Sequence, residues 1–341
     1  MRISFGGGGT DLEAYYAKYG GIVISATINR YFYAIITPTK TDDLQFISTD
    51  YRSPFRHMPY KDLLSDGNLA LPRAVLDHFG IRHGLNLFFA SEVPSGAGLG
   101  SSGAAAVTMV HAISALVKQS MTKLQIAETA SCIEIDQMKM PIGKQDFYAS
   151  AFGGLNKITF TNKEITVEPL RILPVAQKML ESRLMLFFTG SFYELASTLK
   201  RQPESMEEHN DKLLPTLHDI KRVTIDMQSC LERGELDEFA QLLNYCWQQK
   251  HYLAPNLSVP SIDEWYKLAR QHGALGGKIV GGGGGGFLML YCHEEAQDKV
   301  TSVLEEQGLK RMNFLFDHQG AIIVQLNTAS FSNLKMASCA R

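Results

Sequence analysis

The chain has 341 residues, of which 45% are hydrophobic and 20% are charged, and its formal net charge is −2. This length favours two domains over one small core, and the near-neutral charge argues against a nucleic-acid partner. No apolar stretch approaches the about 20 residues that cross a membrane, the N-terminus lacks the apolar core of a secretory signal, and the five cysteines form no CxxC pair. We therefore expect a cytoplasmic protein with reduced thiols.

Strands are predicted in four places between residues 21 and 189. Residues 21–37 are rich in β-branched and aromatic side chains and predict a strand with a break near Asn29. Residues 85–93 alternate apolar and polar side chains and predict a strand that runs directly into a glycine-rich segment. Residues 155–170 predict two strands with a turn, and residues 183–189 predict a buried strand.

Helices are predicted after the glycine-rich segment. Apolar side chains recur at helical spacing over 101–119. A second helix is expected to begin at Thr122, where Thr-x-x-Gln has the form of a capping box, and to end near Met138. Residues 191–272 are predicted to be mostly helical. The remaining predictions are helix breaks at Pro203, Pro215 and Pro255, a strand–loop–strand unit over 278–292, a helix over 300–307 and two short strands over 312–326.

A domain boundary is predicted near 165–180, which divides the chain into residues 1–170 and 171–341. Glycines cluster at 6–9, 96–103 and 281–286. These clusters have different flanking residues, so they are not structural repeats.

The central glycine cluster lies between a predicted strand and a predicted helix. Glycine lets the backbone approach an anion closely, and the N–H groups at the start of the following helix favour negative charge. A structural turn rarely needs four glycines and three serines, so this segment predicts a loop that holds phosphate groups. Its residues are Pro94, Ser95, Gly96, Ala97, Gly98, Leu99, Gly100, Ser101, Ser102 and Gly103.

Two common nucleotide folds are excluded. Gly98-x-Gly100-x-x-Gly103 matches the dinucleotide fingerprint, but that fold needs a second strand about 20 residues later, whereas residues 104–138 predict helices. A Walker A loop is excluded because neither of the two lysines that follow a glycine, Lys144 and Lys278, precedes Ser or Thr.

The three clusters together resemble the motifs of the GHMP kinases, the superfamily of galactokinase, homoserine kinase, mevalonate kinase and phosphomevalonate kinase. The run PSGAGLGSSGAAA is similar to their second motif, residues 2–11 (RISFGGGGTD) to the first, and residues 278–287 (KIVGGGGGGF) to the third. The resemblance implies an α+β fold with two domains, the first like ribosomal protein S5 domain 2 and the second ferredoxin-like. ATP, bound by the loop of residues 94–103, and a sugar would meet in the cleft between them.

The first motif departs from that of galactokinases, which carry Glu-His where Gly8 and Gly9 stand. This difference argues against galactose and leaves room for a larger or phosphorylated ligand. The form GGGGTDL, with YGG at 19–21 and INRY at 28–31, resembles the bacterial D-glycero-D-manno-heptose 7-phosphate kinases. It implies ATP-dependent phosphorylation of the anomeric hydroxyl of that sugar phosphate, towards nucleotide-activated heptose for capsule or lipopolysaccharide. A kinase for fucose, another hexose or a mevalonate-type alcohol, and a non-catalytic sugar sensor, stay open.

The resemblance also implies two catalytic residues. The segment 143–147 (GKQDF) is similar to the family segment with the catalytic aspartate, so Asp146 is expected to guide the acceptor hydroxyl. Arg2 matches the basic residue of the first motif, and an opposite charge nearby favours the carboxylate form. The alternatives are that Asp146 caps a helix at Phe147 and that Arg2 is a disordered terminal charge.

Metal and substrate ligands are implied in the same way. Glu134 lies where relatives place a Mg²⁺ ligand, and the hydroxyls of Ser101 and Ser102 would complete an oxygen-rich shell. Asp136 could replace Glu134, and a solvated helix face is the alternative. Thr10 and Asp11 could cap a turn instead of binding sugar. Arg30, Lys139 and Lys144 stay open as partners of the substrate phosphate, and a monomer and a homodimer both stay open. The candidate substrate ligands are Gly8, Gly9, Thr10, Asp11, Arg30, Lys144, Gly283 and Gly284.

Overall fold

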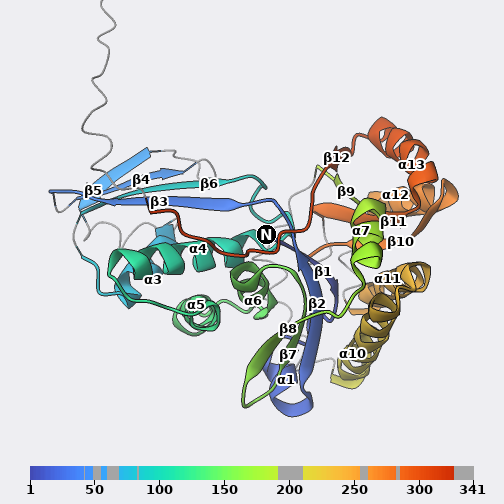
Figure 1. Cartoon of the computed structure of the whole chain (residues 1–341), viewed down its shortest axis with the longest axis horizontal. Coiled ribbons are helices and arrows are strands. Elements are labelled where there is room, and N and C mark those ends of the chain that lie inside the picture. Colours follow the sequence, from blue (N-terminus) through green and yellow to red (C-terminus); the bar gives the residue numbers. More distant parts are fainter. Residues whose placement is uncertain are drawn as a thin grey trace, which may run out of the picture.

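The computed structural model of the protein describes residues 1–41, 43–48, 55–59, 69–82, 84–190, 210–253, 260–281 and 285–325. Three four-stranded sheets organise these residues, and helices pack against each sheet (Figure 1). Two of the sheets belong to the first half of the chain and the third to the second half. Sheets and helices are mixed throughout, as the α+β prediction requires.

The first sheet lies at the centre of the molecule and is antiparallel, with the order β1-β2-β7-β8. Every residue of β1 and β2 is buried. Strands buried on both faces need an almost continuous apolar sequence, which explains why the pattern of residues 21–27 does not alternate. The strands are β1 (Arg2–Gly6), β2 (Gly21–Thr27), β7 (Leu155–Phe160) and β8 (Ile165–Pro169).

The second sheet has the order β3-β6-β4-β5, in which β4 and β6 are parallel and the other pairs antiparallel. Figure 1 shows the helices α3 to α6 on one side of it. Exposure alternates along β3, where Tyr33 and Ile35 are 45% and 57% exposed, because the other side is open. The predicted break near Asn29 is confirmed, since β2 ends at Thr27. The strands are β3 (Phe32–Pro38), β4 (Asp43–Ser48), β5 (Phe55–Pro59) and β6 (Leu85–Ser91).

The helices of the first half include the two that were predicted after the glycine-rich segment. Thr122 forms the capping box with Gln125, so that prediction is confirmed. The second helix then changes to a π-helix, a form that often occurs at functional sites, and this stretch contains Glu134. The helices are α1 (Glu13–Tyr19), α3 (Ala70–His78), α4 (Ser101–Leu116), α5 (Lys123–Ser131), η2 (Cys132–Gln137) and α6 (Gln145–Phe152).

The third sheet is antiparallel with the order β10-β11-β9-β12. Along the chain the order is strand, helices, strand, strand, helix, strand, which is the ferredoxin-like arrangement that the family resemblance implied. The strands are β9 (Leu184–Phe188), β10 (Ala274–Ile279), β11 (Phe287–Cys292) and β12 (Lys310–Met312), and the helices are α7 (Pro174–Arg183), α10 (Asn210–Arg233), α11 (Leu236–Leu253), α12 (Pro260–Gln271) and α13 (Glu294–Glu306).

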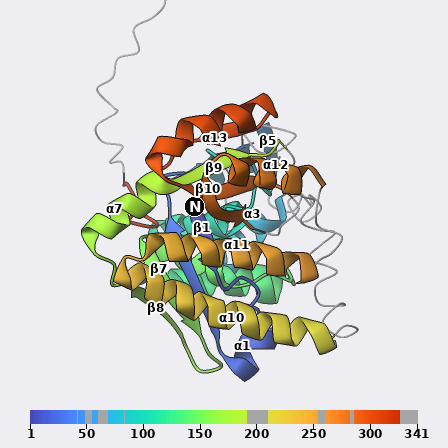
Figure 2. The ribbon, with the colours of Figure 1, turned by 90° about the vertical axis from the view of Figure 1, so that its right-hand side faces the viewer.

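The helices α10 and α11 join the two halves of the molecule. They lie side by side across the face shown in Figure 2, and both contact β1. Phe5 of β1 packs edge-on against Phe239 of α11 with 5.4 Å between ring centroids, and Lys221 of α10 donates a hydrogen bond of 2.6 Å to the Tyr19 carbonyl. One apolar core therefore runs through both halves. The boundary between residues 170 and 171 stays a prediction.

Two predictions for the second half are wrong, the helix break at Pro215 and the two strands over 312–326. Pro215 lies inside α10, where the buried apolar side chains of Leu217, Ile220 and Val223 outweigh the lost backbone hydrogen bond. The helix predicted over 300–307 is confirmed, and it begins earlier, at Glu294. Pro203 and Pro255 lie outside the described residues, as does the last residue of the predicted strands over 312–326.

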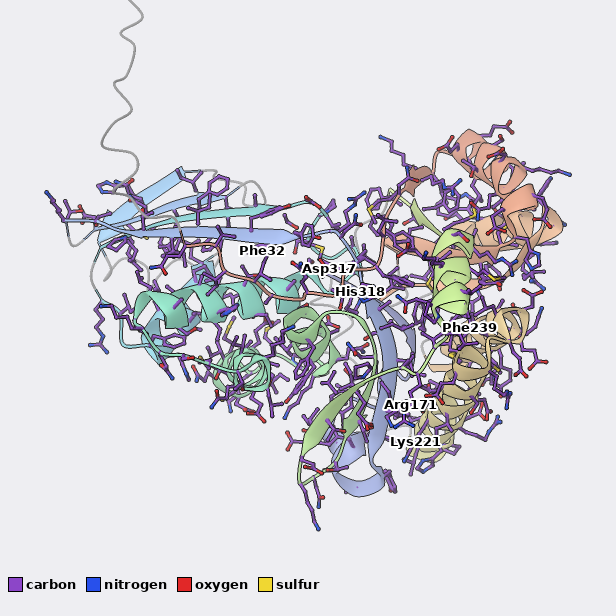
Figure 3. All side chains as sticks on the ribbon, viewed as in Figure 1. Phe32, Arg171, Lys221, Phe239, Asp317 and His318 are labelled. Carbon is purple, nitrogen blue, oxygen red and sulfur yellow. The ribbon has the colours of Figure 1, made fainter. Side chains whose placement is uncertain are left out.

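Instead of the two predicted strands, residues 313–325 form an extended segment that returns to the first half of the chain (Figure 1). Phe316 makes an isolated bridge with Ile28, and the backbone of Asp317 bonds to Thr27 and Gly154. The carboxylate of Asp317 accepts a 2.7 Å bond from Tyr31 (Figure 3 labels Asp317). Within the described part of the chain, no helix is both long enough and apolar enough to cross a bilayer.

Candidate active site

The predicted phosphate loop, residues 94–103, joins β6 to α4. Gly96, Gly98 and Gly100 have φ values of +80°, +87° and +71°, a region that side chains with a Cβ rarely adopt. Gly100 is the N-cap of α4 and provides no side-chain cap. The first N–H groups of α4 are therefore directed to the loop without a capping side chain, which suits an anion.

The described part of the third glycine cluster lies directly behind this loop. A Cβ added to Gly98 would lie 2.1 Å from the Val280 carbonyl oxygen, and one added to Gly281 would lie 2.4 Å from the Gly98 Cα. A Cβ on Gly286 would lie 2.2 Å from the Ala97 oxygen. Glycine is required here for backbone contact between two loops. Gly283 and Gly284 lie outside the described residues.

Arg2 and Asp146 form an ion pair at the base of the loop. Arg2 Nε and Nη2 donate to Asp146 Oδ1 at 2.7 Å and 2.5 Å, and Arg2 Nη1 donates to the Gly98 carbonyl at 2.7 Å. The Arg2 side chain is 6% exposed and that of Asp146 is 26% exposed. Arg2 is thus ordered and buried, and its guanidinium fixes the carboxylate relative to the loop.

Asp146 lies against the glycines of the loop. A Cβ on Gly100 would lie 3.2 Å from the Asp146 Cγ, and one on Gly103 would lie 2.6 Å from the Asp146 Cβ. Helix α6 begins at Gln145, so Asp146 is inside its first turn rather than at the cap, which the alternative reading required. None of the described residues donates a hydrogen bond to Asp146 Oδ2, so this oxygen can accept one from a ligand.

Glu134 meets the loop from the π-helix. The Ser102 hydroxyl lies 2.9 Å and 3.1 Å from the two carboxylate oxygens of Glu134, which is only 2% exposed. The pKa of Glu134 is raised to about 7, mainly by burial and also by the charge of Asp146, while the Ser102 hydrogen bond acts in the opposite direction. A buried carboxylate in contact with the hydroxyl of the exposed Ser102, beside a phosphate loop, offers suitable oxygen ligands for a hard divalent cation. Ser101, half-buried, begins α4 beside them.

The carboxylate of Asp11 binds the start of α6. Its carboxylate accepts bonds from the Gly9 N–H at 2.9 Å and from both the backbone and side-chain nitrogens of Gln145 at 3.1 Å. It is 2% exposed, and burial raises its pKa. Asp11 therefore caps the helix that carries Asp146. The proposed sugar-binding role of Asp11 stays a prediction.

The hydroxyl of Thr10 is also engaged in hydrogen bonds within the protein. It is completely buried, and its hydroxyl donates within the loop to the Gly7 carbonyl at 2.7 Å and lies 3.0 Å from the Ile22 oxygen. Thr10 orders the loop of residues 6–11, which we call the acceptor loop. Gly8 and Gly9, half-buried, remain its described positions for close ligand approach.

The candidate cations lie in different places. Lys144 Nζ lies 5.5 Å from the Tyr16 ring centroid, on the side of α1 next to the acceptor loop. Arg30 bonds to the Asn29 and Asn313 carbonyls and lies 4.0 Å from Glu92, beside the returning segment. The structure therefore places Lys144, and not Arg30, near the acceptor loop.

Sequence reasoning missed two residues of the site. Gln145 connects Asp11 to α6, and its own Oε1 is buried without a hydrogen-bond partner. Lys278 is 4% exposed and donates a 2.6 Å bond to the Phe5 carbonyl. Lys278 stood in the third motif, but the only signal was a lysine inside an otherwise buried strand.

Comparisons with known proteins agree with this geometry. The protein-family model for the GHMP kinases N terminal domain matches residues 68–154, and the family model for the GHMP kinases C terminal matches residues 227–310. A D-glycero-alpha-D-manno-heptose 7-phosphate kinase of Campylobacter jejuni is 31% identical over 332 residues, covering 94% of this chain and 96% of that protein. The chain belongs to the GHMP kinases.

Solved GHMP kinases share the whole fold. A D-glycero-D-manno-heptose 1-phosphate kinase of Bacteroides thetaiotaomicron superposes with a TM-score of 0.76 at 26% identity, covering 95% of this chain and 98% of that one. A galactokinase of Lactococcus lactis gives a TM-score of 0.73 at 18% identity over 95% and 93% of the two chains, which shows likeness of fold alone. The family resemblance and the fold class expected from the motifs are confirmed.

Proposed function

We propose that this GHMP kinase transfers the γ-phosphoryl group of ATP to the anomeric hydroxyl of D-glycero-D-manno-heptose 7-phosphate. The observation that carries the proposal is the contact of the Arg2–Asp146 pair with Gly100 and Gly103 of the phosphate loop. This contact puts a fixed carboxylate beside the glycines that would hold a triphosphate. The name of the Campylobacter jejuni relative supports the choice of acceptor.

In this reaction Asp146 Oδ2 accepts the proton of the acceptor hydroxyl, whose oxygen forms a bond to the γ-phosphorus. The bond between that phosphorus and the β–γ bridging oxygen breaks, and ADP leaves with the electron pair. Arg2 holds Asp146 Oδ1, so the carboxylate cannot rotate away from the acceptor. The N-terminus of α4 and the loop stabilise negative charge on the phosphates. Phosphoryl transfer depends mainly on such positioning and charge stabilisation.

Glu134 and Ser102, with Ser101 beside them, are the residues that would hold Mg²⁺. Bound there, the ion would neutralise phosphate charge and fix the geometry of the triphosphate. Their fit rests on chemistry: two oxygen-bearing side chains in contact, one of them a buried carboxylate without a cationic partner among the described residues.

The acceptor would bind at Gly8 and Gly9 of the acceptor loop, where the missing side chains leave room. Lys144 is our candidate partner for the sugar phosphate because it lies on the α1 side of this loop. Gly283 and Gly284 of the third motif, which lie outside the described residues, stay candidate substrate ligands through the family resemblance alone.

A coupled ADP-release assay with a panel of acceptors tests the proposal. The panel is heptose 7-phosphate, galactose, fucose and mevalonate, each with Mg²⁺ and ATP, and the heptose product is identified by ³¹P NMR. We expect turnover with heptose 7-phosphate and a new anomeric phosphate signal. Turnover only with fucose or mevalonate would assign a different acceptor. Sugar binding by calorimetry without any turnover would identify a sensor and contradict the kinase proposal.

A further inference from the structure

Lys278 is a cation buried between the two halves of the molecule. It lies in β10 of the third sheet, is 4% exposed, and its Nζ donates a 2.6 Å hydrogen bond to the carbonyl of Phe5 in β1. The bond connects residues 273 positions apart in sequence. It is therefore a tertiary contact between the C-terminal sheet and the first strand of the central sheet.

The Phe5 carbonyl is available because β1 contains a bulge. In the pairing with β2, Ser4 lies opposite Ser25 and Gly6 lies opposite Ile24, so Phe5 is an extra residue in the ladder. A bulge leaves a residue outside the ladder and bends its strand. Here the bend directs the chain into the acceptor loop, which begins at Gly6. Lys278 thus binds the backbone at the point where β1 turns into that loop.

The surroundings of Lys278 make this cation costly to keep. The pKa of Lys278 is lowered to about 8, mainly by burial; Cys246 of α11 acts to raise it, and the charge of Arg2 acts to lower it. None of these influences is a carboxylate, so the ammonium has a carbonyl rather than an ion-pair partner. If the side chain at position 278 only had to fill space, an apolar residue there would make the folded protein more stable.

The same strand also reaches the phosphate loop. Two residues after Lys278, the Val280 carbonyl would be 2.1 Å from a Cβ on Gly98. On its other side, the Phe5 ring packs against Phe239 of α11, which Figure 3 labels. One short stretch, 278–281, therefore contacts both the loop for phosphate and the strand end that leads to the acceptor loop.

We propose that Lys278 is a positioning residue for phosphoryl transfer. Its ammonium fixes the start of the acceptor loop relative to the phosphate loop, so that the acceptor hydroxyl and Asp146 stay aligned with the γ-phosphate. This inference rests on the proposed kinase function and deepens it. Displacement of a reacting group by about 1 Å can slow a reaction about 100-fold, so a contact outside the reacting atoms can control the rate.

Lys278→Met tests this role, because methionine is unbranched and apolar but has no donor. Lys278→Arg keeps the charge and the donors. Lys157→Met is the matched control: it also removes a lysine from a 2.6 Å contact, with Glu168, but at the far edge of the central sheet. Circular dichroism and melting temperature establish that each variant folds.

Two readouts separate positioning from a purely structural role. The first is KM for acceptor and ATP together with kcat. The second is the ratio of ADP released to sugar bisphosphate formed, because water can reach the γ-phosphate when the acceptor is misaligned. A purely structural defect lowers the amount of active enzyme, which reduces both products equally and leaves the ratio and the KM values unchanged.

We expect Lys278→Met to lower kcat/KM for the acceptor about 10- to 100-fold, with KM for ATP within about 2-fold of wild type and an ADP-to-product ratio above one. Lys278→Arg should restore part of the loss, and Lys157→Met should match wild type. An unchanged ratio with unchanged acceptor KM would overturn the proposal. If Lys278→Met does not fold, Lys278→Gln, which keeps an N–H donor without charge, is judged by the same criteria.

Assays of the wild-type enzyme separate the proposed kinase function from the proposed role of Lys278. If it phosphorylates an acceptor other than heptose 7-phosphate, the proposed substrate is wrong, and the Lys278 comparison is made with the accepted sugar. If it phosphorylates no acceptor, both proposals are wrong. If wild type turns over heptose 7-phosphate and Lys278→Met does so equally well, only the role of Lys278 is refuted.

Discussion

Replacement of Glu134 by glutamine should make the metal-free protein more stable and the enzyme less active. Glu134 is 2% exposed, and its pKa is raised from 4.5 to about 7, mainly by burial. Glutamine has nearly the same shape, accepts the Ser102 hydrogen bond through Oε1, and carries no charge to bury. The change therefore removes the cost of the charge and leaves the packing nearly intact.

The size of the effect follows from linkage. The folded protein binds the Glu134 proton more tightly than the unfolded chain does. The contribution of this proton to the free energy of unfolding is therefore fully present below about pH 4.5 and is lost as the pH rises through 7. The shift from 4.5 to about 7 is about 2.5 units, and at 1.36 kcal/mol per unit it amounts to about 3 kcal/mol. Glu134→Gln should lack this loss.

Urea unfolding of the EDTA-treated proteins between pH 5 and pH 8 measures this pH-dependent loss of unfolding free energy. The stability gap between Glu134→Gln and wild type should widen by about 2–3 kcal/mol over this range. Glu128→Gln, an exposed carboxylate on the neighbouring helix α5, should follow wild type. Mg²⁺ with ADP should then stabilise wild type and not Glu134→Gln. Parallel pH profiles for Glu134→Gln and wild type would refute the reasoning, because they would mean that the buried carboxylate costs nothing.

Three further substitutions test the site. Asp146→Asn should lower kcat by about 100- to 10,000-fold in the ADP-release assay with little change in KM for ATP. Equal losses of turnover and of ATP affinity would mark a structural role. Gly98→Ala should abolish nucleotide binding in calorimetry because its Cβ would lie 2.1 Å from the Val280 oxygen, whereas Gly80→Ala, with φ +67° and no atom within 4 Å of the Cβ, should bind normally. Asp11→Ala should lower the melting temperature by removing a helix cap worth about 1 kcal/mol and should raise acceptor KM; unchanged values would contradict the capping role.

The parts of the site that could be predicted from sequence are those that follow one another closely along the chain. The phosphate loop, the helix after it and the acidic residue of the next helix lie within about 40 residues, and their motif order identified the family. Ser102 and Glu134 meet because α4 and the π-helix are neighbours. Arg2 and Asp146 were paired through the family resemblance alone, since 144 residues separate them.

Contacts that depend on tertiary packing could not be predicted. The Asp11 carboxylate caps a helix 134 residues away, and no periodicity signals that partner. The strand prediction for residues 313–325 was wrong for a related reason. Ile322, Ile323 and Val324 have high strand propensity, yet they are 63%, 40% and 74% exposed, because strand propensity depends on a neighbouring strand that is absent beside the described residues there.

The returning segment has a consequence for attempts to divide the protein. Because Phe316 and Asp317 pair with residues 27 and 28, and because α10 covers the central strands, the first 170 residues lack pieces of their own surface when expressed alone. A chimera that joins this half to the second half of another GHMP kinase would have to preserve the contacts of Phe316 and Asp317 and those of α10, as well as the linker. The proposed role of the acceptor loop in substrate preference is therefore better tested by grafting that loop than by swapping halves.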